Sequence, residues 1–162
     1  MTELGIAASK LRAQRLGPGA AAAAELEALA KSAGHSLEGT RAALELALEW
    51  QVSPGEIASL VNTAQATYGV TSATVWVLLS ANVFTAPLRA IALALALSER
   101  VQVRASRREP VFTHCLYRAA PHLFGNIAEL APHTGDLVLA YGSDETLTEV
   151  ESTLPEGVNL FG

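Results

Sequence analysis

The spacing of apolar residues divides the chain near residue 70. Before that point apolar positions recur at helical spacing, most clearly from Ile57 to Ala64, where they follow the i, i+3, i+4, i+7 pattern. The run from Ser53 to Glu56 is a capping-box sequence with a proline at the first helical position, so a helix should start at Pro54. Two further helices are expected, over 20–33 and 40–50.

Beyond residue 70 short β-branched runs alternate with helical patterns. The run 74–79 is rich in β-branched and aromatic residues and is apolar at every position after Thr74, which is typical of a strand covered on both faces of a sheet. Further strands are expected over 101–104, 137–141 and 158–161, and helices over 87–97, from Pro110 towards Phe124, and beyond Ser143. This alternation predicts an α/β fold, with a helical N-terminal segment (1–70) followed by a Rossmann-like parallel sheet with crossover helices (71–162).

Composition narrows the functional classes. The chain has 162 residues, of which 50% are hydrophobic, enough for a core of ordinary size. A formal net charge of -5 argues against a general nucleic-acid binder. One cysteine, Cys115, excludes an internal disulfide, supplies no metal-ligand spacing and favours the cytoplasm, and it is expected to be buried in a helix. The longest apolar run, 90–97, is much shorter than the roughly 20 residues that span a bilayer, which predicts no membrane span.

Positive charge gathers at the end of one predicted strand. Four arginines lie between Arg100 and Arg108, whereas seven acidic residues and no lysine or arginine follow Arg118. Ligands of α/β sheets bind at the carboxyl ends of strands, so Arg104, Arg107 and Arg108 predict an anionic ligand. A solvated surface cluster remains the alternative.

Two other strand ends carry candidate polar residues. Gly142 and Ser143 precede a predicted helix, whose N-terminus suits a phosphate, although a serine at such a position more often simply caps its helix, with Asp144 and Glu145 complementing the dipole. Asn82 follows the first strand and by itself is typical of a turn. The chain has neither a GxGxxG nor a P-loop sequence, so the two strongest phosphate-binding motifs are absent.

Three segments together resemble a known family. In order they are Leu79-Ser80-Ala81-Asn82-Val83, Arg104-Ala105-Ser106-Arg107-Arg108-Glu109-Pro110 and Tyr141-Gly142-Ser143-Asp144-Glu145-Thr146. They resemble the cofactor-binding half of the aldehyde dehydrogenase superfamily, and most closely the acyl-CoA reductases of the bacterial bioluminescence type, which form fatty aldehydes with NADPH. The resemblance covers most of the chain from about Thr40.

The resemblance implies a nicotinamide cofactor site. Arg104 falls on a lysine that contacts the adenosine ribose, and Ser106 falls on a small residue of the adenine pocket. Arg107 stands where NAD-preferring relatives often carry a glutamate, so a guanidinium there favours the 2′-phosphate of NADP. Gly142 and Ser143 fall on a pair beside the pyrophosphate. The residues expected to contact NADP are Arg104, Ser106, Arg107, Arg108, Gly142 and Ser143.

The resemblance also implies what this chain lacks. Asn82 falls on an asparagine that holds the oxyanion during catalysis, but the family keeps its catalytic cysteine in a domain beyond the position of Gly162. This chain is therefore expected to be inactive alone, with acyl-CoA a partner only when that domain is present. The alternative is a non-catalytic nucleotide-binding or assembly module, and a generic α/β domain also remains open. A homo-oligomer or a following domain is expected to cover the last strand.

One departure from the family concerns the sheet itself. Between Gly125 and Leu137 the family has a strand and a further helix, but only about a dozen residues are present here. A sheet strand is therefore expected to be missing, or reduced to 127–130.

Overall fold

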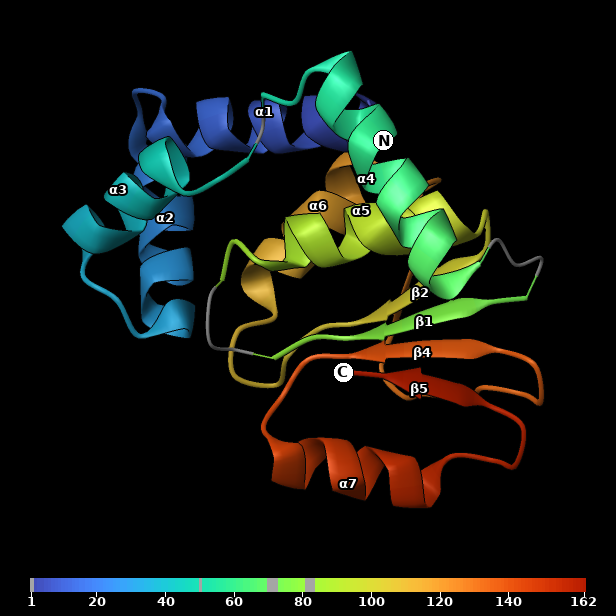
Figure 1. Cartoon of the computed structure of the whole chain (residues 1–162). Helices are drawn as coiled ribbons and strands as arrows, with labels where there is room; N and C mark the ends of the chain where they lie inside the picture. Colours follow the sequence, from blue (N-terminus) through green and yellow to red (C-terminus); the bar gives the residue numbers. More distant parts are fainter. Residues whose placement is uncertain (1, 50, 70–72, 81–83) are drawn as a thin grey trace.

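The described part of the chain forms four N-terminal helices followed by a five-stranded parallel sheet with three further helices (Figure 1). The computed structural model describes residues 2–49, 51–69, 73–80 and 84–162. The helices are α1 (Thr2–Leu16), α2 (Ala20–Ala33), α3 (Leu37–Leu46), α4 (Pro54–Tyr68), α5 (Pro87–Leu97), α6 (Val111–Ala119) and α7 (Asp144–Thr153). The strands are β1 (Val75–Leu78), β2 (Val101–Arg104), β3 (Gly125–Ile127), β4 (Leu137–Ala140) and β5 (Asn159–Phe161). The predicted α/β class with a Rossmann-like parallel sheet is confirmed.

Local capping signals explain the helix bounds. In α4 the Glu56 amide donates to Ser53 Oγ at 3.2 Å and the Ser53 amide donates to Glu56 Oε2 at 2.8 Å, so the predicted capping box is formed. The prediction for α3 was wrong by three residues at its start, because Ser36 is the N-cap and accepts from the Gly39 amide.

Helix α6 is shorter than predicted. It ends at Ala119 rather than continuing towards Phe124. Ala120 is its C-cap, and Pro121 follows. A proline disfavours helical geometry at the residue before it and has no amide hydrogen to donate, which explains the early end.

The strand order is β3-β2-β1-β4-β5, and every pairing is parallel. A strand does exist in the segment where one was expected to be missing or reduced, but it spans Gly125–Ile127 rather than 127–130. A Cβ atom at Gly125 would collide with the end of the Gln102 side chain on β2, so a larger residue there would require that flexible side chain to move. Residues 128–136 then lead to β4 without an intervening helix.

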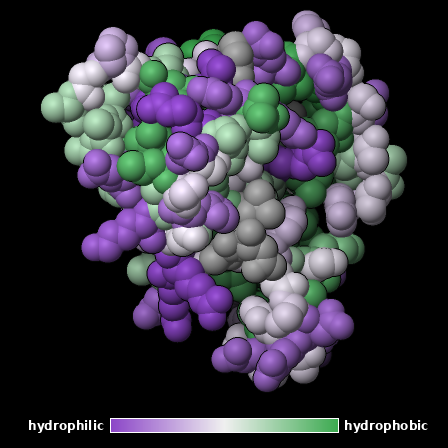
Figure 2. All heavy atoms as spheres, turned by 90° about the vertical axis from the view of Figure 1, so that its left-hand side faces the viewer, coloured by the Kyte–Doolittle hydropathy of each residue, from purple (hydrophilic) through white to green (hydrophobic). Residues whose placement is uncertain are grey.

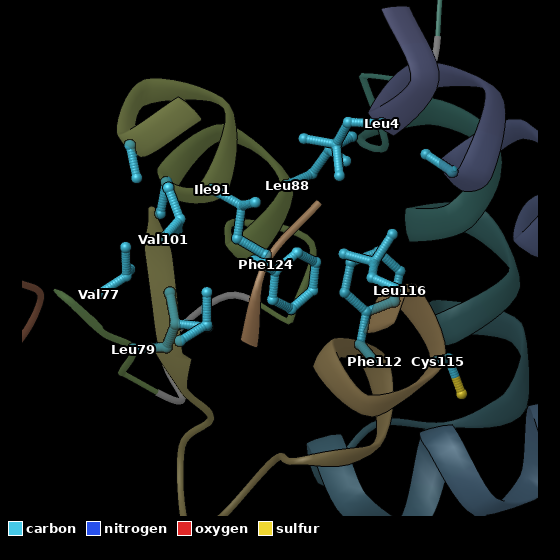
Figure 3. Close-up of a cluster of buried hydrophobic side chains, with 14 of the residues drawn as sticks. Leu4, Val77, Leu79, Leu88, Ile91, Val101, Phe112, Cys115, Leu116 and Phe124 are labelled. Atoms are coloured by element: carbon cyan, nitrogen blue, oxygen red, sulfur yellow. The ribbon is translucent and has the colours of Figure 1, made fainter. Parts of the chain in front are cut away.

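Helices cover both faces of the sheet. Figure 1 shows α5 and α6 on one face and α7 on the other. Side chains alternate accordingly along β1, where Val77 joins the larger hydrophobic cluster and Leu78 the smaller one under α7. The larger cluster includes Leu4 of α1 as well as Phe112 of α6 (Figure 3), so one hydrophobic core contains both N-terminal helices and sheet residues. The boundary at residue 70 stays a prediction.

One carboxylate joins the amino ends of β1 and β4. Asp136 is 8% exposed and accepts hydrogen bonds from the Thr74 amide (3.0 Å), the Trp76 indole (2.9 Å) and the His133 amide (2.9 Å). Burial opposes its ionisation, but the hydrogen bonds from His133, Trp76 and Thr74 outweigh burial and hold the pKa of Asp136 below its usual 3.8. Asp136 therefore fixes how β4 sits beside the central strand.

The β5 edge predicts self-association. β5 is the last strand of the sheet, and its Phe161 is 38% exposed even though the ring packs edge-on against Tyr68. An unpaired edge with apolar surface pairs readily with other chains. We expect sedimentation velocity to give a larger mean mass as concentration rises, and we expect Asn159→Lys to reduce this effect. A monomer at high concentration would contradict this.

Candidate functional site

The candidate site is the edge of the sheet where the strands end. Because all pairings are parallel, the segments that follow β1, β2 and β4 leave from the same edge. The chain places β2 on one side of β1 and β4 on the other, so the strand order reverses between β1 and β4. Ligands of open α/β sheets bind at such a switch point. Figure 2 looks onto this edge, where strongly hydrophilic residues are prominent on its lower half.

The arginines lie at this edge, one strand away from the switch point. Arg107 and Arg108 are exposed in the loop between β2 and α6, and Arg104 at the end of β2 is half-buried. Burial lowers the pKa of Arg104, the neighbouring Arg107 lowers it further, and Glu129 works in the opposite direction. The loop therefore offers concentrated positive charge to an anionic ligand.

Hydrogen bonds organise the backbone of this arginine loop, residues 105–110. The Arg108 amide donates to Ser106 Oγ at 3.2 Å, which forms a tight serine turn. The Phe112 amide donates to Glu109 Oε1 at 3.0 Å, and Glu109 is only 3% exposed. Burial raises the pKa of Glu109, while hydrogen bonds from Phe112, Val111 and Ser32 partly offset that effect.

The residues after β4 form a helix start. Ser143 is the N-cap of α7, accepting from the Thr146 amide at 3.4 Å, so the capping role left open by the sequence is present. Gly142 leaves room for Thr146, because a Cβ atom at Gly142 would lie 3.0 Å from its side chain. Asp144 and Glu145 occupy the first turn of α7 and oppose a phosphate there, although the helix dipole favours one.

Asn82, the predicted oxyanion donor, lies outside the described residues. The nearest described residues are Ser80, which is half-buried, and Phe84, which is buried in the larger hydrophobic cluster. Leu79 follows β1 directly and is also buried in that cluster.

Cys115 is buried in α6, as predicted, and is 2% exposed. Its sulfur accepts from the guanidinium of Arg15 on α1 at 2.6 Å and from that of Arg118 at 3.1 Å. Figure 3 shows Cys115 on the side of α6 that faces the N-terminal helices. The thiol therefore belongs to a helix–helix contact rather than to the carboxyl edge of the sheet.

A large open groove lies between the N-terminal helices and α5. Its volume is about 1320 Å³, and most of its lining is apolar, including Ile6, Leu60 and Leu93. Thr85 and Tyr141 also line it, so the groove reaches the segments that follow β1 and β4. Burial, with a smaller contribution from Tyr68, raises the pKa of Tyr141.

Sequence patterns did not predict the roles of two residues that organise the arginine loop, Glu109 within it and Ser32 on α2. Glu109 was treated only as part of a motif, although an acid before a proline at a helix start signals a cap. Ser32 on α2 has its hydroxyl 3.5 Å from both the Arg108 carbonyl and Glu109 Oε1, and no local pattern indicates this contact.

The described residues show no metal centre and no membrane-spanning helix. Within the described ranges no group of three or more His, Cys, Asp or Glu side chains could hold a metal ion. Over the same part of the chain, no helix combines the length and apolar character needed to cross a membrane. No model of a known protein family, no curated protein and no solved structure matches this chain.

Proposed function

We propose that this chain binds NADPH, and that it is the cofactor-binding part of an NADPH-dependent acyl-CoA reductase related to the aldehyde dehydrogenases. The observation that carries the proposal is the placement of Arg104, Arg107 and Arg108 at the carboxyl edge, one strand from the switch point between β1 and β4. Guanidinium groups at that position suit a ligand with several phosphates, because they bind phosphate oxygens in pairs.

The residues fit one end of the cofactor better than the other. Arg107 and Arg108 are exposed cations on an organised loop, which suits a 2′-phosphate. In this proposal Arg104 lies by the adenosine ribose and Ser106 by the adenine. At α7 the dipole and Gly142 favour the pyrophosphate, but the acidic first turn reduces that attraction. The 2′-phosphate contacts therefore contribute most of the proposed selectivity.

The reaction assigned to the whole enzyme needs parts besides the cofactor. NADPH would supply a hydride, and the groove beside Tyr141 would accept the apolar acyl group. The resemblance assigns stabilisation of the developing oxyanion to Asn82. Acyl transfer also needs an accessible thiolate. Cys115 is buried against Arg15, so this chain alone is expected to reduce no acyl-CoA.

The burial of the Cys115 thiol also favours a second candidate function, a non-catalytic nucleotide-binding module. Both candidates require the same cofactor site and differ only in whether chemistry follows binding. An acyl-CoA reduction assay with NADPH separates them only for a protein that contains the catalytic cysteine.

Isothermal titration with NADPH and with NADH tests the proposed cofactor site. We expect binding of both, with NADPH at least about tenfold tighter, because one added charge-assisted phosphate contact contributes ~1.5 kcal/mol or more. Titration with adenosine 2′,5′-bisphosphate and adenosine 5′-monophosphate should show the same preference. If neither nucleotide binds, the chain is a generic α/β domain.

A further inference from the structure

The arginine loop is held at both of its ends. On the β2 side the Arg108 amide donates to Ser106 Oγ, and on the α6 side the Phe112 amide donates to Glu109 Oε1. Pro110 is the N-cap of α6 and makes no side-chain cap hydrogen bond. The carboxylate of Glu109 therefore replaces the missing cap, at a helix end where the dipole favours a negative charge.

Glu109 is an acidic residue among arginines that does not pair with them. Within the described residues it forms no ion pair with Arg107 or Arg108. It turns inwards, is 3% exposed and acts on backbone amides instead. The guanidinium groups of Arg107 and Arg108, which precede Glu109 in the chain, thus stay exposed and available to an anion.

Helix α2 reaches the same carboxylate. Ser32 Oγ lies 3.5 Å from Glu109 Oε1 and 3.5 Å from the Arg108 carbonyl oxygen. A hydroxyl has one hydrogen, so Ser32 divides it between these two acceptors and each contact is weak. Together they place α2 directly behind the backbone from which Arg108 projects.

We propose that Glu109 is a positioning residue for the 2′-phosphate site, which fixes the backbone that carries Arg107 and Arg108 and joins that backbone to α2 through Ser32. This inference rests on the proposed NADPH site. When an arginine lies on a mobile loop, ordering the side chain and the loop on binding costs part of the free energy of its phosphate contact. A loop that is already fixed in the free protein avoids the loop part of that cost, so the ligand binds more tightly. The N-terminal helices thereby contribute to cofactor selectivity without touching the cofactor.

The test compares Glu109→Ala with Glu109→Gln by isothermal titration of NADPH and NADH. Glu109→Ala should weaken NADPH binding about tenfold and NADH binding less than about twofold, since only the 2′-phosphate contacts lose their fixed loop. The amide oxygen of Glu109→Gln still accepts from the Phe112 amide and should restore most of the affinity. Ser32→Ala should have a smaller effect in the same direction.

Ser98→Ala is the matched control, because it removes side-chain to backbone hydrogen bonds at the amino end of β2, whereas the arginine loop follows the carboxyl end of that strand. It should lower the melting temperature and leave the ratio of NADPH to NADH affinity unchanged. If Glu109→Ala behaves in the same way, or weakens both cofactors equally, Glu109 is merely structural and the inference fails.

A double-variant comparison separates this failure from failure of the proposed site. If Arg107→Ala/Arg108→Ala loses no NADPH affinity, the proposed site itself is wrong. If that variant loses affinity but Glu109→Ala does not, only the positioning role is wrong. If the arginine variant and Glu109→Ala each lose NADPH affinity, adding Glu109→Ala to the arginine variant should cause little further loss. The guanidinium groups that Glu109 positions are already absent from that variant.

Discussion

Replacing Arg107 and Arg108 together by alanine is expected to weaken NADPH binding about a hundredfold and NADH binding less than about threefold. Each charge-assisted contact to the 2′-phosphate should contribute ~1.5 kcal/mol, the low end of the range, because both side chains are exposed. NADH lacks that phosphate and loses only general attraction. Isothermal titration of both cofactors against both proteins measures the difference.

The salt dependence of the same titration gives a second measure. The preference for NADPH should shrink as salt rises, because exposed ion pairs are screened over roughly 10 Å at 0.1 M salt. Arg41→Ala/Arg100→Ala is the control, since it removes the same charge from exposed sites away from the arginine loop. If Arg107→Ala/Arg108→Ala loses equal affinity for NADPH and NADH, or loses none, the arginine loop is a solvated surface cluster and not a 2′-phosphate site.

Replacing Asp136 by alanine should give the largest loss of stability that we predict. It leaves the Thr74 amide, the Trp76 indole and the His133 amide without their acceptor at a buried position. We expect a loss on the order of 3 kcal/mol, or about 10 °C in melting temperature for a domain of this size. Glu99→Ala, an exposed carboxylate before β2, is the control and should change little.

The contribution of Asp136 should depend on pH with a definite sign. Its folded pKa lies below its ordinary value of 3.8, so the charged form is favoured by folding. The stabilisation is fully present above the unfolded pKa and is lost as the pH falls through the folded pKa. The stability difference between wild type and Asp136→Ala should therefore be constant near neutral pH and narrow in acid. Urea denaturation across that range would contradict the assignment if the difference grew instead.

Local signals explain which elements the sequence predicts correctly. The bounds of α5 and β2 match the expectation residue for residue, because Pro87 occupies the first turn of the helix and β-branched residues define the strand. β3 has only three half-buried residues and depends on pairing with β2, so its own pattern was too weak to give its bounds. Tertiary contact outweighs local preference there.

The candidate site, like the fold, was predictable from the sequence only in part. Arg104, Arg107 and Arg108 were placed at a strand end from the sequence, and the structure puts them there. The contacts that organise them involve residues far apart in the chain, such as Ser32 and Glu109, which are 77 positions apart. Such a pair forms only when α2 packs near α6, and nothing in either local sequence indicates it.

The position of β1 in the middle of the sheet also has a consequence for the order in which the chain folds. Figure 1 shows β1 and β4 side by side in colours far apart on the sequence scale, and Thr74 meets Asp136 across 62 positions. β1 can pair with β2 soon after synthesis, but its other edge stays open until β4 emerges from the ribosome. During that interval an apolar central strand has one unsatisfied side, which is a hazard for aggregation. Pauses in translation between β2 and β4 should therefore lower the yield of folded protein more than pauses before β1.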